Sequence, residues 1–295
     1  MEYLEDYFIE GDSYRDWLNL ATSSKKSNVA KLEAIEDLLY SRYCCYDSII
    51  INYSLGLSNS ELKEHSDLLI EYYNKPPLSL NKKLKDRRVN HGLNECPFCG
   101  NPSPPDTLDH FVPKNYWPEF SIFPNNLVPQ CRGCAPTKGD KFYCSNDNLA
   151  MFIHPIYSDL MSKVEFKFYI DFNEENNKET IDVKFSIPSD LDNQEESKKR
   201  ITSHIKSLRI KQRSIVFAQR NIRHWKNLLK KGDFDISTVL NSRVSERNIE
   251  KVYQNWESAL YKCILGNEVF LNYLNSLRAT DKAHIEHVDR IELDL

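Results

Sequence analysis

Residues 96–141 decide the fold class of this chain, and they read CPFCGNPSPPDTLDHFVPKNYWPEFSIFPNNLVPQCRGCAPTKGDK. The segment contains two Cys-x-x-Cys pairs, Cys96 with Cys99 and Cys131 with Cys134. Four thiolates in two such pairs can surround one zinc ion as a tetrahedron. The pairs are further apart than in a simple zinc ribbon, so the spacing predicts a further element between them.

The remaining cysteines follow no ligand spacing. Cys44, Cys45, Cys144 and Cys263 are scattered, and we expect them to be small apolar side chains. A reducing cytosol argues against disulfides. The alternative for the two pairs is four unrelated buried cysteines, which the repeated spacing makes improbable. We therefore expect a structural Zn²⁺ site that is closed by four protein ligands.

The residues between and after the two pairs resemble the HNH endonuclease family, in the branch whose cysteine pairs flank the ββα-metal motif. The matching residues are Leu108-Asp109-His110-Phe111-Val112-Pro113-Lys114, Asn126-Leu127-Val128-Pro129-Gln130 and Ala135-Pro136-Thr137-Lys138-Gly139-Asp140-Lys141. The resemblance implies an endonuclease that hydrolyses the phosphodiester bonds of DNA or RNA. With its helical flanks, the chain is also similar to the HNH subunits of Septu-type bacterial anti-phage systems, which implies an ATPase protein partner.

The resemblance also assigns the catalytic roles. His110 is the candidate general base, because a histidine of ordinary pKa, about 6.5, accepts protons near neutral pH. Asp109 offers an oxygen ligand to a catalytic Mg²⁺ or Mn²⁺. Neighbours in a strand point to opposite faces, so the two share a site only if the strand bends or one acts through its backbone. Asn126 matches the asparagine that holds the motif's loop and orients the base. Alternatively, Asn126 is an ordinary turn asparagine, and the adjacent Asn125 competes for the same role.

One position departs from the family pattern. The residue after the last cysteine is usually a histidine or asparagine that provides the second ligand of the catalytic metal, and here it is Ala135. Three explanations compete: an inactivated variant in which alanine replaces the ligand, a replacement donor such as Asp140 or His154, or a naturally inactive nuclease kept for binding. We favour the first, because Asp109 and His110 are both intact. A structural histidine is the alternative for His154.

The flanking sequences predict helices and one hairpin. Apolar residues recur with helical period from Val29 to Leu39, behind the N-cap candidate Ser27. A series spaced by seven predicts one long helix that ends at Gly232: Ile201, Leu208, Ile215, Ile222 and Leu229. Alternating apolar residues in 164–172 and 181–187 predict two antiparallel strands joined by a polar turn.

The expected fold class is α+β, with a ββα-metal HNH nuclease core and a four-cysteine zinc site. The expected domains are a helical N-terminal region (1–90), the zinc-stapled nuclease core (91–160), a β-hairpin (161–190) and a helical C-terminal region with a basic helix (191–295).

The net charge of −4 does not by itself indicate a nucleic-acid-binding protein. However, residues 198–231 contain many lysines and arginines and no acidic residue. Such a concentration suits contact with a phosphate backbone, although a solvated helix face is the alternative. The candidate nucleic-acid-binding residues are Lys114, Lys138 and Lys141 of the motif and Arg209, Arg213 and Arg220 of this segment.

Other properties limit the remaining functions. The sequence has no apolar run of about 18 residues and no secretory signal at its start, so we expect a cytoplasmic protein without a membrane span. The acidic and aromatic residues 2–8 are a candidate surface for the protein partner. The alternative function is a catalytically inactive, zinc-stabilised module that binds nucleic acid or a partner; Ala135 favours it, and the Asp109–His110 pair argues against it.

Overall fold

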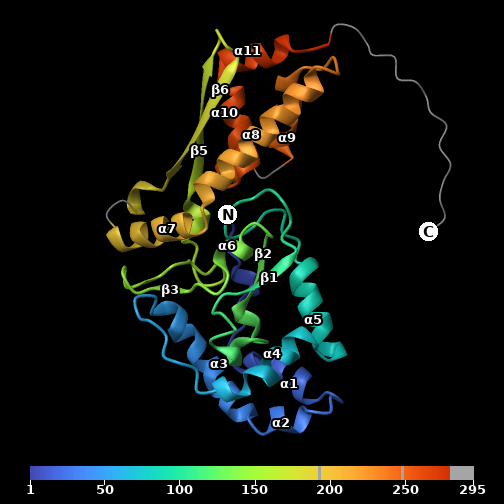
Figure 1. Cartoon of the computed structure of the whole chain (residues 1–295), viewed down its shortest axis with the longest axis vertical. Helices are drawn as coiled ribbons and strands as arrows, with labels where there is room; N and C mark the ends of the chain where they lie inside the picture. The colour runs from blue at the N-terminus through green and yellow to red at the C-terminus, as the bar shows by residue number, and fades with distance from the viewer. Residues whose placement is uncertain (192–193, 247–248, 280–295) are drawn as a thin grey trace, which may run out of the picture.

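The computed structural model describes residues 1–191, 194–246 and 249–279. Within the predicted C-terminal region (191–295), residues 192–193, 247–248 and 280–295 lie outside the described residues. The molecule is elongated: the N-terminal helices form one end, and the C-terminal helices with a long hairpin form the other (Figure 1). The cysteine-rich segment lies between these two ends. One connected apolar core runs through all of these parts.

The N-terminal region is helical, and its longest helix, α3 (Glu36–Ile51), buries two tyrosines on one face. The helices of this region are α1 (Asp16–Thr22), α2 (Val29–Glu33), α3, α4 (Ser66–Asn74) and α5 (Leu78–Val89), with 3-10 turns at Glu5–Tyr7, Gly11–Arg15 and Lys63–His65. Helix α3 buries Leu39, Tyr43, Tyr46 and Ile50, whose spacing places them on one helix face. Tyr43 stacks on Phe123 of the cysteine-rich segment, with ring centroids 4.5 Å apart. Helix α3 therefore supports the loop that the cysteine pairs enclose.

The cysteine-rich segment forms an antiparallel strand pair followed by a one-turn helix. Strand β1 (Thr107–His110) pairs with β2 (Leu127–Gln130), and Asp109 lies opposite Val128. Helix α6 (Ala135–Lys138) starts directly after the second cysteine pair. The other elements here are 3-10 turns at Pro118–Phe120, Pro124–Asn126 and Leu160–Lys163 and a small strand pair, β3 (Tyr143–Cys144) with β4 (Leu149–Ala150).

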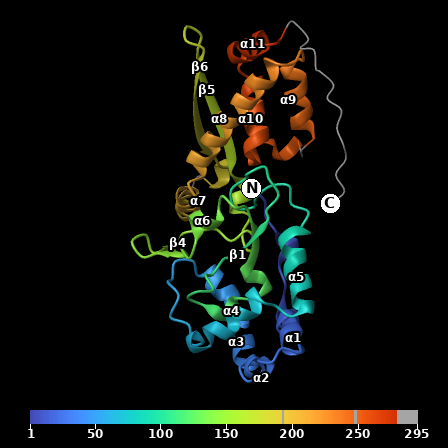
Figure 2. The same ribbon diagram turned by 45° about the vertical axis from the view of Figure 1, so that its right-hand side comes forward.

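The predicted hairpin is confirmed. Strands β5 (Glu165–Asn173) and β6 (Lys178–Ser186) are antiparallel, and Glu165 lies opposite Ser186. Alternate residues of both strands are buried on one face, as the sequence pattern requires. Helices α8 and α10 pack against this hairpin (Figure 2). The C-terminal helices are α7 (Glu195–Ser207), α8 (Ile210–Leu229), α9 (Ile236–Ser245), α10 (Trp256–Leu265) and α11 (Glu268–Ser276), with 3-10 turns at Ser189–Leu191 and Ile249–Gln254.

Two helices that the sequence predicted as continuous are interrupted. Ile35 has a non-helical ψ of 9° and separates α2 from α3. Arg209 adopts a left-handed conformation, with φ 50° and ψ 38°, and separates α7 from α8. Leu32 and Leu39 remain buried on either side of the first break, and Leu208 is buried at the second. Tertiary packing therefore decides both breaks, and the apolar period continues across them without a glycine or proline to reveal them.

The overall architecture is α+β, as expected. In the described residues, the strands form three separate two-stranded antiparallel sheets among the helices. No helix in the described ranges is both long enough and apolar enough to span a membrane.

Candidate metal centre and active site

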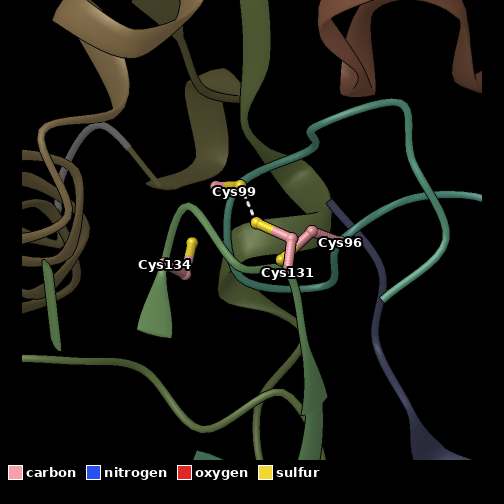
Figure 3. A group of neighbouring side chains, drawn as sticks. All are labelled: Cys96, Cys99, Cys131 and Cys134. Atoms are coloured by element: carbon pink, nitrogen blue, oxygen red, sulfur yellow. Dashed lines mark hydrogen bonds between the residues drawn. The ribbon is translucent and has the colours of Figure 1, made fainter. Parts of the chain in front are cut away.

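Each cysteine pair lies on a tight turn, and the two turns share one backbone hydrogen-bond pattern. The amides of the second cysteine and of the next residue both donate to the carbonyl of the first cysteine. The distances are 3.2 and 2.8 Å onto Cys96, and 2.9 and 3.2 Å onto Cys131. Gly100 after the first pair has a φ of 70°, which glycine adopts without strain. Figure 3 shows the four side chains meeting from these two turns.

The four sulfur atoms form a buried cluster that fits one metal ion. They lie within 4.8 Å of one another, and the sulfurs of Cys99 and Cys131 are 3.8 Å apart. A zinc ion with four Zn–S bonds of about 2.3 Å in tetrahedral geometry would separate its sulfurs by about 3.8 Å. All four cysteines are free thiols and all are buried. The donor set and its geometry therefore suit a structural metal such as zinc, as the spacing predicted.

The surroundings of the cluster shift the thiol pKa values in opposite directions. Burial raises the pKa of the Cys96 and Cys134 thiols, whereas hydrogen bonds from the neighbouring thiols lower the pKa of Cys131. Burial also works against the charge of Arg213, but the adjacent thiolates outweigh it and raise the pKa of this guanidinium. A divalent metal ion, which is also positively charged, would likewise stabilise the thiolate form of the cysteines.

The Asp109 carboxylate forms a second, different site at the end of β1. Its Oδ1 lies 3.1 Å from Nζ of Lys138, which comes from α6. The same ammonium donates to the backbone carbonyl of His110 at 3.0 Å. Lys138 is fully buried, and the Asp109 side chain is 9% exposed. The Lys138 ammonium thus contacts both neighbours: the side chain of Asp109 and the backbone carbonyl of His110.

The His110 imidazole is held in one tautomer. Its Nε2 lies 3.0 Å from the carbonyl oxygen of Ser121, so this nitrogen carries the hydrogen and donates it. Nδ1 is then the acceptor. Tyr73 of α4 packs against the ring, with centroids 4.3 Å apart. Burial, together with the positive charge of Lys114, lowers the pKa of His110 well below 6.5. The ring is therefore neutral at pH 7.

Asn126 fastens the loop between the two strands. Its Oδ1 accepts hydrogen bonds from the Val112 amide and the Tyr46 hydroxyl, both at 2.7 Å. Its Nδ2 donates to the carbonyls of Val112 and Phe120, both at 3.0 Å. Asn125 instead bonds the backbone of the N-terminal segment. The side chain of Asn126 is fully used inside the loop, which it holds in place beside His110.

One oxygen of Asp109 is available for a cation. Its Oδ2 is buried and has no hydrogen-bond partner among the described residues. Magnesium in proteins often binds one or two carboxylates, and water and phosphate complete its shell, so this atom fits such an ion. Ala135 begins α6 and offers no donor. In the described part of the chain, only the four cysteines form a group of three or more His, Cys, Asp or Glu side chains close enough to hold an ion.

The two replacement donors that we considered are engaged elsewhere. In His154, Nδ1 accepts the Ile156 amide at 3.2 Å and Nε2 lies 3.3 Å from the Tyr46 hydroxyl, so neither nitrogen is free. Asp140 is exposed and accepts a hydrogen bond from the Asn115 side chain at 2.8 Å. Burial raises the pKa of Asp109, and the negative charge of Asp140 acts in the same direction.

The predicted nucleic-acid-binding residues separate into two groups. Lys141, Arg209 and Arg220 are exposed, and Lys114 is partly buried; burial lowers the pKa of its amine, and the charges of Asp140 and Asp109 oppose that shift. The other two point inward: Lys138 pairs with Asp109, and Arg213 contacts the cysteine sulfurs. Lys138 is fully buried and therefore does not belong to the surface that nucleic acid could contact, whereas the guanidinium of Arg213 is partly buried and already donates to the sulfurs.

The sequence did not reveal what the N-terminal helices contribute to this site. Tyr73 contacts His110, and Arg88 of α5 donates to the Tyr73 hydroxyl at 3.4 Å. Arg87 is instead partly buried and donates to the backbone carbonyls of Tyr7, Pro124 and Leu127. The basic run that contains both arginines is visible in the sequence. The direction of each side chain follows only from the packing of α5 against β1 and β2.

Aromatic side chains of the N-terminal segment also pack within the chain. The Tyr7 hydroxyl donates to the His91 carbonyl at 2.9 Å, and Phe8 contacts Tyr157 with ring centroids 5.1 Å apart. Residues 7 and 8 of the proposed partner surface are therefore engaged in the fold.

The fold and the metal centre together define an α+β protein with a buried four-cysteine centre. The chain is similar to a protein of Escherichia phage lambda, "Protein ea31", with 30% identity over 193 residues. The similarity covers 60% of this chain and 63% of that protein, which is less than two thirds of its length. No protein-family model and no solved structure matches the chain.

Proposed function

We propose that this chain is an HNH-type endonuclease that hydrolyses phosphodiester bonds of DNA or RNA. The observation that carries the proposal is the Asp109–His110 pair at the end of β1, because α6 contacts both residues through Lys138 while the Ser121 carbonyl fixes the tautomer of His110. The order of strand, strand and helix around the cysteine pairs is the order that the HNH resemblance implies.

In the proposed reaction, Nδ1 of the neutral His110 takes a proton from a water molecule. The resulting hydroxide attacks the phosphorus atom, the bond to the leaving oxygen breaks, and that oxygen takes up a proton from solvent. The Lys114 amine lies 5.3 Å from the centre of the Tyr73 ring, which packs against His110, so it can pair with the phosphate. Lys138 is buried, so its role is to position Asp109 and the end of β1.

A catalytic Mg²⁺ or Mn²⁺ would be held by Oδ2 of Asp109, with water and phosphate as further ligands. When bound, such an ion would neutralise the charge that develops on the phosphate. Ala135 withholds the second protein ligand that HNH enzymes use, so the metal affinity of this sequence should be low.

Three features suggest where nucleic acid and a partner would bind. Arg209, Arg220 and Lys141 are exposed, and their charge suits a phosphate backbone. The resemblance to Septu-type HNH subunits is our ground for proposing an ATPase partner and a role in anti-phage defence. The similarity to a phage lambda protein adds no activity to that proposal.

The experiment that tests the proposed function compares three proteins on single- and double-stranded DNA and RNA in Mg²⁺ or Mn²⁺. They are the chain itself, the Ala135→Asn variant, and Ala135→Asn combined with His110→Ala. High enzyme concentration and long incubation reveal basal cleavage without a partner. We expect cleavage by Ala135→Asn that the second substitution abolishes, with unchanged zinc content. Cleavage that persists without His110 would exclude it as the base.

A second candidate is a zinc-stabilised binding module without catalysis. It is favoured by Ala135 and by the Lys138 ammonium, which already occupies one oxygen of Asp109. Absence of cleavage by Ala135→Asn, together with salt-dependent binding of the same nucleic acids, would support this candidate over the nuclease.

A further inference from the structure

The guanidinium of Arg213 lies against the cysteine cluster rather than on the surface. Nη1 donates to the sulfur of Cys134 at 3.2 Å. Nη2 reaches the sulfurs of Cys131 and Cys99 at 3.5 and 3.6 Å. One side chain of the basic helix α8 thus contacts three of the four cysteines, and it reaches both turns of the metal centre.

Neighbouring groups fix this guanidinium in place. Nη1 also donates to the Leu208 carbonyl at 3.2 Å, at the break between α7 and α8. The ring of Trp256 lies 5.5 Å from the guanidinium carbon, a distance that allows a cation–π contact. On the side of the second turn, a Cβ at Gly133 would lie 2.5 Å from Nη2, so any other residue there would require the guanidinium to move.

The first cysteine turn is bonded to the same C-terminal helices. His204 of α7 contacts the Phe98 carbonyl through Nε2 at 2.7 Å. The Trp256 amide, at the start of α10, donates to the Gly100 carbonyl at 3.1 Å. A Cβ at Gly100 would lie 2.8 Å from the Gln254 carbonyl oxygen, so the two backbones meet closely here. The shape of the cysteine turns therefore determines where α7 and α10 dock.

Charge explains why arginine suits this position. A divalent ion with four thiolates carries a net charge of −2, which is costly in a buried place unless a cation compensates it. Groups around the first ligands of a metal orient those ligands and tune the affinity for the ion. The planar fork of arginine can donate to several sulfurs at once, whereas a lysine offers one point charge.

We propose that Arg213 is an outer-shell residue of the cysteine metal centre, and that the loaded centre positions helix α8 on the core. The metal site then does more than staple residues 96–134 together. It also sets the place of the exposed Arg209 and Arg220 relative to Asp109. This inference depends on the metal centre and not on nuclease activity, so it can fail or stand independently of the proposed function.

The first test measures how fast the purified, zinc-loaded protein releases zinc to a chromogenic chelator. The variants are Arg213→Gln and Arg213→Lys, and Arg209→Gln is the matched control because it removes an exposed arginine near the same end of α8. Loss of an outer-shell partner typically weakens metal binding about 10- to 100-fold. We expect release from Arg213→Gln to be faster by about that factor, with Arg213→Lys between it and the control. Release equal to that of Arg209→Gln would overturn the proposal.

The second test asks whether Arg213 transmits the state of the centre to α8. Amide hydrogen exchange is compared between zinc-loaded chain and zinc-loaded Arg213→Gln, so both proteins stay folded. We expect faster exchange in residues 207–217 of the variant, while the distant N-terminal helix α3 is unchanged. Unchanged exchange in 207–217 would show that Arg213 does not couple α8 to the metal centre.

Discussion

The cysteine centre and the Asp109 site lie in the same strand–strand–helix segment, yet they differ in the number of donor atoms that each offers to a metal ion. The cysteine centre has four donors from two matching turns, with sulfurs spaced as one tetrahedral ion requires. The Asp109 site has one carboxylate with an unpartnered oxygen, a neighbouring histidine that contributes its backbone carbonyl, and Lys138, which pairs with the other carboxylate oxygen. The cysteine centre thus has a complete donor set for one ion, whereas a cation at Asp109 would find one carboxylate oxygen, because Lys138 pairs with the other.

The two sites also differ in the origin of their parts. Every ligand of the cysteine centre comes from two four-residue turns. The Asp109 site is assembled from β1, α6, the loop that Asn126 holds, and Tyr73 of α4. The first can form wherever its two turns meet, whereas the second depends on the whole fold.

Removal of one cysteine ligand should have the largest effect. Cys131→Ser takes away one of the four sulfur donors, so we expect loss of the tightly bound ion and loss of cooperative unfolding. Binding of a structural zinc contributes about 10–16 kcal/mol in small zinc domains, which exceeds the stability of most proteins. Metal analysis and thermal unfolding measure the result, with Cys144→Ser as the control outside the centre. A Cys131→Ser protein that keeps its ion and its transition would remove the basis of the comparison.

Disruption of the Asp109–Lys138 pair should have the next largest effect. Lys138→Met keeps the apolar stem but leaves a buried carboxylate without its cation, which typically costs about 3–5 kcal/mol. We expect a loss of that size in urea unfolding of the zinc-loaded protein without added Mn²⁺ or Mg²⁺, and partial recovery in millimolar Mn²⁺ because the ion can then take the place of the ammonium. Lys141→Met, an exposed neighbour, is the control. No loss of stability would mean that the pair is not formed.

A pH-dependent effect should be the smallest. The folded pKa of His110 is lowered, so the unfolded chain takes up a proton that the folded chain refuses, and stability falls as the pH drops below about 6.5. His110→Gln removes this group. Below pH 6.5 we expect the stability of the variant to fall less steeply with pH than that of the chain, by about 1.4 kcal/mol per pH unit. Urea unfolding at several pH values measures the slopes; equal slopes would mean that His110 is not buried in its neutral form.

The cysteine centre and the hairpin could be predicted because their signals are local. The spacing of Cys96, Cys99, Cys131 and Cys134 contains the whole donor set, and the alternation of apolar residues in β5 and β6 reports directly which side chains are buried. The same is true of the adjacency of Asp109 and His110, which the chain itself guarantees.

The inward direction of charged side chains could not be predicted. From the sequence we predicted that Lys138 and Arg213 contact phosphate, because the sequence shows their charge. It does not show which groups surround each side chain in the fold. Arg213 points at the cysteines only because α8 begins anew after the left-handed Arg209. The sequence has no glycine or proline at this break that would have predicted it. The break follows from the packing of Leu208 and Ile210, which are both buried in the core.

We propose that residues 96–141 contain one complete metal site and a second site that lacks a ligand at position 135. Equilibrium dialysis with Mn²⁺, on the zinc-loaded chain and its Ala135→Asn variant, tests it most directly. We predict about one retained zinc per chain in both proteins and Mn²⁺ binding at least about tenfold tighter in the variant, the size of one added ligand of about 1.4 kcal/mol. Equal Mn²⁺ affinity in the two proteins would contradict the claim.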